Sequence, residues 1–290
     1  MTQTRRVHPA WIAAIVTFFT LVATAGFRSA PSVLIVPLED AFGWGRDQIS
    51  LAISVNVLLY GLTAPFAAAL MERFTVRKVV MAALTTVSTG AFLTTFVHAP
   101  WQLVLTWGVI VGIGTGSMAL VFAATVANRW FVKRRGLVVG ALTAAAATGQ
   151  LVFLPGLTAL SENHGWRSIG LTIGSASLLM VPFIYFFLRE KPADLGLLPY
   201  GADESWQPPV KSTMSAGRLA IVTLKEASVH KDFWYLFGTF FVCGLSTSGL
   251  IGTHFIPAAH DHGMAEVMAA SLLALVGVFD VIGTLASGWL

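Results

Sequence analysis

The chain contains the stretch Ala68-Ala69-Leu70-Met71-Glu72-Arg73-Phe74-Thr75-Val76-Arg77-Lys78-Val79, in which four charged side chains lie between two long apolar runs. These runs cover residues 49–70 and 79–97. A helix needs about 20 apolar residues to cross the hydrocarbon core of a bilayer, which is about 30 Å thick. The stretch is therefore interpreted as the polar turn between two membrane-spanning helices.

Six further apolar runs of similar length lie on either side of this pair, at residues 11–36, 101–126, 136–160, 169–188, 233–256 and 267–290. Charged residues make up only 11% of the chain, against about 25% in soluble domains. The mean hydropathy is +0.75. This composition excludes an ordinary water-soluble enzyme and predicts an all-α polytopic membrane protein with eight spans in a lipid bilayer.

The 18 Lys and Arg residues are distributed unevenly among the loops. Fifteen of them precede the first run or lie in every second loop: Arg5, Arg6, Arg73, Arg77, Lys78, Arg129, Lys133, Arg134, Arg135, Arg189, Lys191, Lys211, Arg218, Lys225 and Lys231. Because cytoplasmic loops are enriched in Lys and Arg, we expect the N-terminus and the central loop in the cytoplasm. The protein is predicted in the plasma membrane, the inner membrane of a bacterium. The pI near 9.5 thus reflects topology, and no nucleic-acid partner is expected.

Cofactor chemistry finds little support in the sequence. The single cysteine, Cys243, excludes a disulfide framework and a cysteine metal cluster. No Gly-x-x-x-x-Gly-Lys-Ser/Thr or His-Glu-x-x-His motif is present. The run His260-Asp261-His262 has metal-binding side chains but no further ligand nearby in the sequence. We therefore predict no cofactor and no metal centre.

The chain divides into three parts, at residues 1–188, 189–231 and 232–290. The middle part contains the pair Pro208-Pro209 and is interpreted as a cytoplasmic linker. An offset of 220 residues superposes Pro37 on Pro257 and Gly43 on Gly263, which indicates a parallel repeat. The first unit then has six spans and the second has two, so we interpret the sequence as a fragment that lacks about four spans.

The turn quoted above resembles the signature Gly-x-Leu-x-Asp-Arg-x-Gly-x-Arg-Arg/Lys of the major facilitator superfamily of secondary transporters. Leu70, Arg73, Arg77 and Lys78 match it, and Glu72 replaces Asp. The resemblance implies that Glu72, Arg73, Arg77 and Lys78 gate the cytoplasmic ends of neighbouring helices. It also implies the major facilitator fold, here as the first six-helix bundle and two helices of the second. Ala68 and Thr75 stand where glycines are usual, and Thr75 is expected to strain or widen the turn.

A second set of residues is similar to the monocarboxylate transporter branch, which includes oxalate/formate-type antiporters. The set consists of Trp130-Phe131-Val132-Lys133-Arg134-Arg135-Gly136 with Gly140 and Gly149. This resemblance implies a transporter of small organic anions. Span 101–126 also carries Gly108, Gly112 and Gly116 at steps of four, a pattern that favours close helix packing.

Two charged residues, Arg28 and Asp280, lie well inside the predicted spans. A charge near the bilayer centre costs at least about 2.5–3.5 kcal/mol, so such residues face a partner or a water-filled space. At 1.5 Å per helical residue they lie about 12 Å and about 20 Å below the same membrane face. We expect Arg28 to bind the substrate carboxylate and Asp280 to carry a coupling proton or to release Arg28 from an ion pair. A static pair that staples the two halves is the alternative.

Four polar residues in the spans are further candidates for the same site: Asn56, Tyr60, Gln150 and His254. An imidazole can relay protons near neutral pH, which favours His254. Each of the four is also explained by a hydrogen bond between helices.

The predicted function is secondary active transport of a small organic anion, a monocarboxylate, by alternating access, with protons as the possible coupling ion. Efflux of other small molecules and a transport-inactive membrane sensor are the alternatives, and a membrane enzyme is a third. The sequence leaves open the substrate, the direction of transport and the coupling ion.

Overall fold

The computed structural model describes residues 8–203, 205–207 and 214–289. Within these residues, eight helical stretches are long and apolar enough to cross a membrane. They are Pro9–Phe42, Arg46–Arg73, Val76–Thr94, Pro100–Trp130, Arg135–His164, Arg167–Phe187, Lys231–Asp261 and Glu266–Trp289. The eight predicted spans and the all-α class are confirmed. Arg5, Arg6, Pro208, Pro209 and Lys211 lie outside the described residues.

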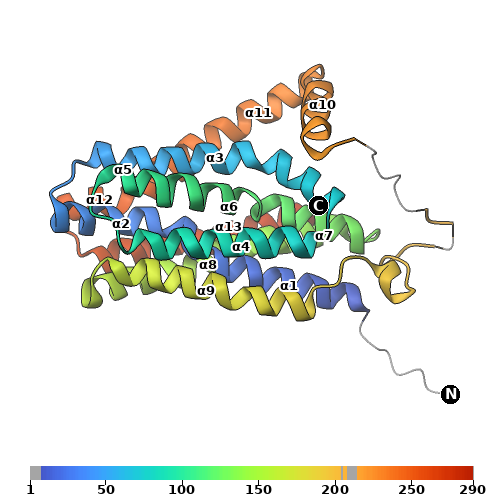
Figure 1. Cartoon of the computed structure of the whole chain (residues 1–290), viewed down its shortest axis with the longest axis horizontal. Coiled ribbons are helices and arrows are strands. Elements are labelled where there is room, and N and C mark those ends of the chain that lie inside the picture. The colour runs from blue at the N-terminus through green and yellow to red at the C-terminus, as the bar shows by residue number, and fades with distance from the viewer. Residues whose placement is uncertain (1–7, 204, 208–213, 290) are drawn as a thin grey trace.

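Six spans come from the first part of the chain and run roughly along the long axis of the molecule (Figure 1). Four of them are α3 (Arg46–Arg73), α4 (Val76–Thr94), α8 (Arg135–His164) and α9 (Arg167–Phe187). The other two are interrupted. The first consists of α1 (Pro9–Thr24) and α2 (Gly26–Phe42), and the fourth consists of α5 (Pro100–Leu103), the π-helix η1 (Val104–Val111), α6 (Gly112–Gly116) and α7 (Ala119–Trp130).

The second part of the chain adds two spans. The seventh consists of α11 (Lys231–Cys243), the π-helix η3 (Gly244–Ile251) and α12 (Gly252–Asp261), and the eighth is α13 (Glu266–Trp289). Between the two parts lie the short 3-10 helix η2 (Pro192–Leu195) and the amphipathic helix α10 (Ala216–Ser228). The predicted linker thus contains regular structure.

The two ends of the bundle differ in charge. One end holds the start of α1, the turn between α3 and α4, and α10 (Figure 1). Of the 15 Lys and Arg residues in the described chain, all except Arg28, Arg46 and Arg167 belong to the turns and helix ends on this side, and we call it the basic end. The opposite end holds the turn between α2 and α3 and the turn between α12 and α13.

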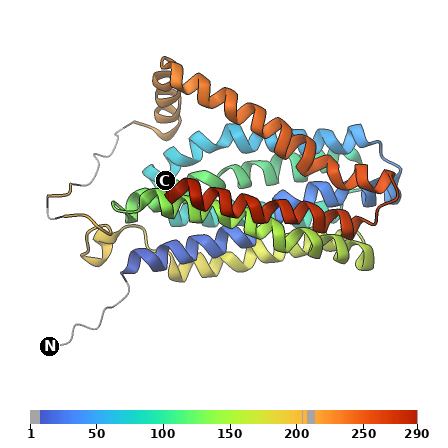
Figure 2. The same ribbon diagram turned by 180° about the vertical axis from the view of Figure 1, so that it is seen from behind.

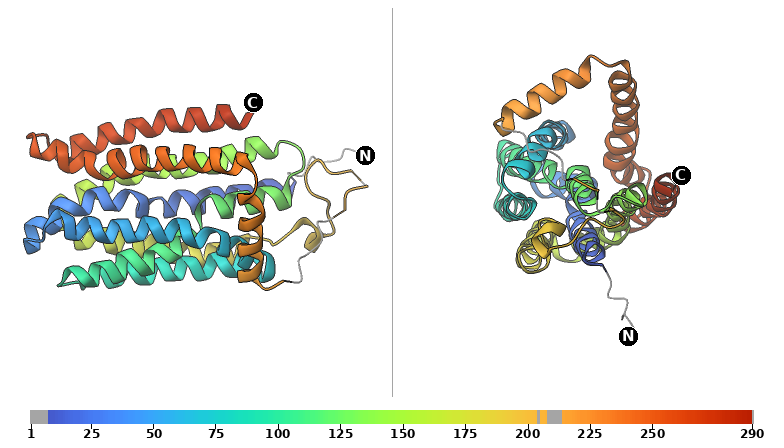
Figure 3. Two further views of the ribbon diagram at one scale, coloured as in Figure 1. Left: turned by 90° about the horizontal axis from the view of Figure 1, so that it is seen from above. Right: turned by 90° about the vertical axis from the view of Figure 1, so that its right-hand side faces the viewer.

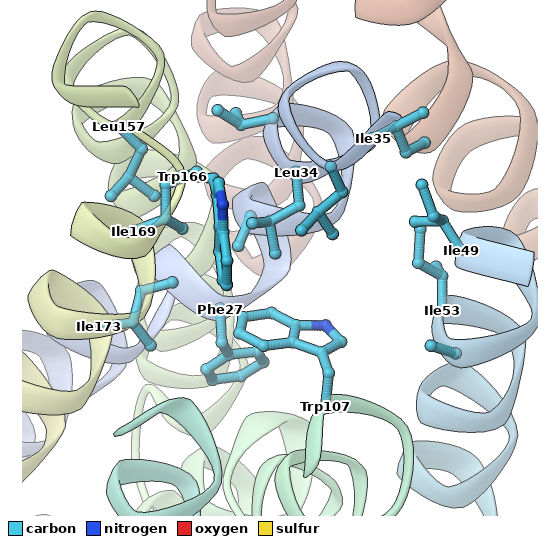
Figure 4. Close-up of a cluster of buried hydrophobic side chains, with 14 of the residues drawn as sticks. Phe27, Leu34, Ile35, Ile49, Ile53, Trp107, Leu157, Trp166, Ile169 and Ile173 are labelled. Carbon is cyan, nitrogen blue, oxygen red and sulfur yellow. The ribbon is translucent and has the colours of Figure 1, made fainter. Parts of the chain in front are cut away.

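Two clusters of buried apolar side chains form the core. The cluster towards the opposite end joins the first six spans to α12 and α13. Figure 4 labels its members Phe27, Leu34, Ile35, Ile49, Ile53, Trp107, Leu157, Trp166, Ile169 and Ile173. The second cluster, towards the basic end, contains Phe122, Trp130 and Phe131 and draws only on the first six spans and the segment that follows α9. The two units are therefore held together by apolar packing at the opposite end.

Helices α8 and α13 pack side by side over much of their length (Figure 2). Glycines allow this close approach. A Cβ atom added to Gly140 would lie 2.7 Å from the carbonyl oxygen of Thr284, and one added to Gly288 would lie 2.7 Å from that of Gly136. Further along, Gly277 faces Ala147. The contact between α8 and α13 is thus a close approach of the two helix backbones at these glycines.

The glycines of the fourth span have the packing role that their spacing predicts. A Cβ atom added to Gly108 would lie 3.1 Å from the carbonyl oxygen of Ala52, and one added to Gly116 would lie 2.6 Å from that of Tyr60. Both contacts are with α3. The π-helix η1 presents this face to α3.

Helix α11 diverges from the bundle towards the basic end (Figure 2; Figure 3, right). None of its residues is buried, and it packs against η3 and α10. At the basic end α11 is therefore separated from the first unit, whereas α13 stays in contact with α8 there through Gly136 and Gly288.

The repeat of 220 residues is visible in the helix boundaries. Arg46 begins α3 and Glu266 begins α13, at a separation of 266 − 46 = 220 residues. Gly43 and Gly263 end the preceding helices with left-handed φ angles of 66° and 81°. The break between α1 and α2 at Ala25 corresponds to the first turn of η3. Equivalent helices thus carry an irregular turn at equivalent positions.

Thr75 corrects one expectation from the sequence. It has extended backbone angles, φ −158° and ψ 148°, which any residue adopts. Its Oγ1 accepts a hydrogen bond of 3.2 Å from the backbone N–H of Lys78 and so caps the N-terminus of α4. The predicted strain was wrong, because this position does not need a left-handed conformation.

Candidate functional site

Arg28 of α2 and Tyr60 of α3 lie together in the first unit. Arg28 is in the first turn of α2, and its side chain is exposed although its neighbours Phe27 and Ser29 are buried. Its guanidinium carbon lies 5.9 Å from the centre of the Tyr60 ring on α3. A cation over a tyrosine face is attracted by the negative potential of the ring. The ring therefore orients Arg28 while leaving its N–H groups available for an anion.

Asp280 lies on the same face of α13 as residues that pack into the core. Leu273, two turns earlier, and Ala269, three turns earlier, are both buried in the cluster at the opposite end. Asp280 itself is exposed. The offset of 220 also makes Asp280 the equivalent of Tyr60. The repeat thus supports an inward-facing position for Asp280.

Arg28 and Asp280 are not paired in this structure. No ion pair within 4.0 Å involves either side chain in the part of the chain that is described. The alternative of a static Arg28–Asp280 ion pair between the two units is therefore not seen in this conformation. Both charges are free to meet a ligand.

Asn56 is occupied by a contact between helices. Its Nδ2 donates a hydrogen bond of 2.7 Å to the carbonyl oxygen of Trp107 in η1. This contact joins α3 to the fourth span, one turn from Tyr60. Asn56 fits the packing alternative, and it positions the face of α3 that carries Tyr60.

Gln150 lies between the two contact faces of α8. Gly149 and Phe153 contact the first span, whereas Ala147 and Leu151 contact α13. On a helical wheel, Gln150 falls in the sector between these pairs. It is half-buried and remains a candidate for the inner face.

His254 lies apart from the packed face of α12. Thr253, Ile256 and Pro257 are buried, and His254 is exposed. The structure gives it no partner among the described residues, and it does not join Arg28 and Tyr60. Its role in the site stays a prediction.

The predicted gating turn at the basic end is held by a residue that the sequence did not single out. Glu190, which follows α9, pairs with Arg129 of α7 and accepts a hydrogen bond of 2.9 Å from the backbone N–H of Val76. Arg129 also donates to the carbonyl oxygen of Met71 at 2.9 Å. Glu190 and Arg129 thus tie the sixth and fourth spans to the turn between α3 and α4. Because the charge pattern marks Arg129 only as an orientation anchor, the sequence does not reveal this pair.

The four predicted gating residues behave differently from one another. The Arg77 guanidinium lies 5.3 Å from the Tyr185 ring centre, and Arg73 lies 5.8 Å from the Phe74 ring centre. Glu72 and Lys78 are exposed, and in the described chain their side chains make no ion pair. Of these residues, Arg77 is therefore held against the sixth span at Tyr185. The side chains of Glu72 and Lys78 remain available for ion pairs in another conformation.

An ion-pair cluster closes the opposite end. Arg46, the first residue of α3, donates two hydrogen bonds to the Asp261 carboxylate at 2.5 and 2.8 Å. Its Nε donates to Glu39 of α2 at 2.9 Å. Asp261 ends α12, so this cluster joins the two units, and we call it the Arg46 latch. The sequence places Arg46 among the loop residues and predicts no role for it.

A helical bundle of two repeated units with eight helices long enough to span a membrane and charged contacts at both ends has the architecture of a membrane transporter. Residues 16–290 match the family model described as Major Facilitator Superfamily. The chain belongs to the major facilitator superfamily. This family consists of transporters, which rejects the alternative of a membrane enzyme.

Curated relatives give the same family. The chain is 27% identical over 286 residues to the "Uncharacterized MFS-type transporter YcxA" of Bacillus subtilis, an alignment that covers 97% of this chain and 64% of that protein. It is 33% identical over 177 residues to human "Monocarboxylate transporter 7", covering 60% of this chain and 33% of the relative. The chain therefore spans less than two thirds of the length of these relatives.

Solved structures agree on the fold. The xylose transporter XylE from E. coli, in a partially occluded inward-open conformation, matches with a TM-score of 0.63 at 13% identity. The match covers 95% of this chain and 71% of that one. The predicted major facilitator fold is confirmed.

Proposed function

We propose that this protein is a secondary transporter of small organic anions, with monocarboxylates as the substrate class. The observation that carries the proposal is the exposed Arg28 guanidinium held over the Tyr60 ring. A guanidinium stays charged and binds a carboxylate through two parallel N–H donors. Relatives named monocarboxylate transporters support the same class.

Asp280 is the second functional group in this proposal. An unpaired carboxylate on the inner face of α13 can take up a proton, or can compete with the substrate for Arg28 in another conformation. Asp280 belongs to the second unit and Arg28 to the first. The distance between the two side chains therefore depends on the relative orientation of the units. This dependence would couple charge movement to alternating access.

The Arg46 latch and the divergence of α11 support a conformation open towards the basic end. The positive-inside rule makes that end cytoplasmic, with the N-terminus and the central segment on the same side. The matching structure of the xylose transporter XylE is partially occluded and inward open, which supports this assignment. The protein would then lie in the plasma membrane, which for a bacterial chain is the inner membrane.

Uptake of radiolabelled pyruvate tests the proposal. We expect proteoliposomes with the full-length protein to accumulate pyruvate when an inward proton gradient is applied. Arg28→Gln should abolish uptake, and Arg28→Lys should retain a small part of it, because lysine keeps the charge but not the paired donors. Asp280→Asn should retain binding and lose the dependence of uptake on the proton gradient.

Wild-type uptake and wild-type pH dependence in both Arg28→Gln and Asp280→Asn would refute these roles. Efflux of other small molecules is tested by the reverse assay with preloaded vesicles. A sensor would bind pyruvate without moving it. Thr75 caps α4 with ordinary backbone angles, so its replacement of the usual glycine gives no support to a transport-inactive sensor.

A further inference from the structure

A cleft at the opposite end is lined by carboxylates from both units. Its volume is about 360 Å³. Three acidic side chains line it: Asp40 near the end of α2, Glu162 near the end of α8, and Glu266 at the start of α13. Pro37 and Ala41 form an apolar wall beside them. The cleft is separate from the Arg28 site, because Arg28 lies in the first turn of α2 and the cleft residues Asp40 and Ala41 lie in its last turn.

None of the three carboxylates is directly paired with a basic side chain in the described part of the chain, and His260 is the basic side chain that acts on Glu266 from nearby. In the described residues, no ion pair within 4.0 Å involves Asp40, Glu162 or Glu266. No described arginine lines the cleft, and two arginines near this end have other hydrogen-bond partners. Arg46 binds Glu39 and Asp261, and Arg167 donates to the carbonyl oxygen of Thr95. Three like charges around one cleft repel one another unless a cation lies between them.

Ser161 gives independent evidence for a ligand. Its side chain lines the cleft and is only 5% exposed, and its hydroxyl has no hydrogen-bond partner. A buried hydroxyl without a partner costs roughly 1–3 kcal/mol, so such groups usually have a role or a missing partner. A donor group on a ligand in the cleft would satisfy it.

The dimensions of the cleft select the class of cation. No set of three or more His, Cys, Asp or Glu side chains in the described part of the chain is arranged to hold a metal ion. The volume exceeds what a bare ion needs. A chain of methylene groups with several ammonium groups fits better, because it can reach separate carboxylates and place its carbon atoms against Pro37 and Ala41.

We propose that this cleft binds an organic polyammonium ion, and that the bound ion holds the two units together at the opposite end. Asp40 and Glu162 belong to the first unit, and Glu266 belongs to the second. A ligand that contacts both units binds best when this end is closed, and so it shifts the population towards that state. The effect adds to that of the Arg46 latch.

Equilibrium binding of radiolabelled spermidine tests the site. The protein is placed in nanodiscs of phosphatidylcholine, which lack the anionic lipids that bind spermidine themselves. We expect saturable binding with one site per chain. Glu162→Gln and Glu266→Gln should each weaken binding at least tenfold, and Glu266→Asp should retain most of it. Asp47→Asn removes an exposed carboxylate at the same end, outside the cleft, and should leave binding unchanged.

Absence of saturable binding would overturn the proposal. Equal weakening by Asp47→Asn and Glu266→Gln would also overturn it, because binding would then follow net charge alone. Displacement of spermidine by an equal concentration of Mg²⁺ would show a simple ion site instead. Since the assay measures binding without transport, its result is independent of whether pyruvate is carried.

Discussion

Arg46 binds Asp261 through both of its terminal nitrogens, across the boundary between the two repeated units. The two residues lie at the start of α3 and at the end of α12, 215 positions apart in the sequence. Both side chains are more than 40% exposed, so water screens the attraction between them. The Arg46 latch therefore favours the conformation in which the opposite end is closed, but the ion pair is weak enough for this end to open.

Asp261→Asn should open the opposite end. An exposed ion pair contributes about 0.2–1 kcal/mol, which corresponds to a change in population of up to about fivefold. Spin labels at the exposed residues Gln48 and Ala258, after Cys243→Ser, report the distance across this end. We expect the fraction of long distances to rise. Asp47→Asn is the control, and an equal rise there would assign the effect to net charge.

Tyr60 should act through its ring rather than its hydroxyl group. Tyr60→Leu removes the aromatic face under Arg28, and an exposed cation–π contact is worth about 0.5–1 kcal/mol. We expect pyruvate binding to weaken about two- to fivefold. Tyr60→Phe keeps the face and should bind as the wild type does. Loss in Tyr60→Phe would mean that the hydroxyl group contacts the substrate.

Glu190→Gln should destabilise the basic end. The substitution removes the carboxylate that binds Arg129 and the N-terminus of α4, at a cost of about 1–3 kcal/mol. We expect a lower apparent midpoint of thermal unfolding in nanodiscs at a fixed heating rate. Glu72→Gln removes an exposed carboxylate from the same end and should not change the midpoint. Equal midpoints for the two variants would contradict the network.

Two glycines of α8 give a matched test of the α8–α13 interface. Gly140→Ala would place a Cβ atom 2.7 Å from the Thr284 carbonyl oxygen, so the helices must separate at a cost of about 1–3 kcal/mol. Gly156→Ala meets no atom within 4 Å and should be neutral or stabilising. The apparent unfolding midpoint distinguishes them. A similar fall in both would show that helix propensity, and not contact, controls stability.

Arg134 has the one left-handed backbone among the non-glycine residues in the described chain, with φ 60°. It precedes the first turn of α8. The left-handed conformation costs an ordinary residue about 1–2 kcal/mol. Arg134→Gly should therefore raise the apparent unfolding midpoint, and Arg134→Val should lower it. A fall in both would mean that the arginine side chain is needed for stability.

The fold was largely predictable because a bilayer imposes one length and one composition on every span. The interruptions were not. The π-helices η1 and η3 and the break at Ala25 differ from ordinary helix only in which carbonyl each N–H meets, and hydropathy carries no information on that choice. Their positions depend on neighbouring helices, as the contact of Asn56 with Trp107 illustrates.

The candidate site was predictable where isolated charges identify it. Arg28 stands out in the sequence because a charge inside a span is costly, and the structure places it beside Tyr60, another predicted residue. Glu190 and Arg46 do not stand out, because acidic and basic residues are common near the ends of spans. Only the packing of spans that are distant in sequence gives these two their partners.

The glycine-lined contact between α8 and α13 has a mechanical consequence. Where side chains interlock, one helix must unpack before it can move along another. Gly136, Gly140 and Gly288 instead bring smooth backbone surfaces together. Small shifts of one helix along the other then cost little, so this pair can serve as the pivot about which the two units rock.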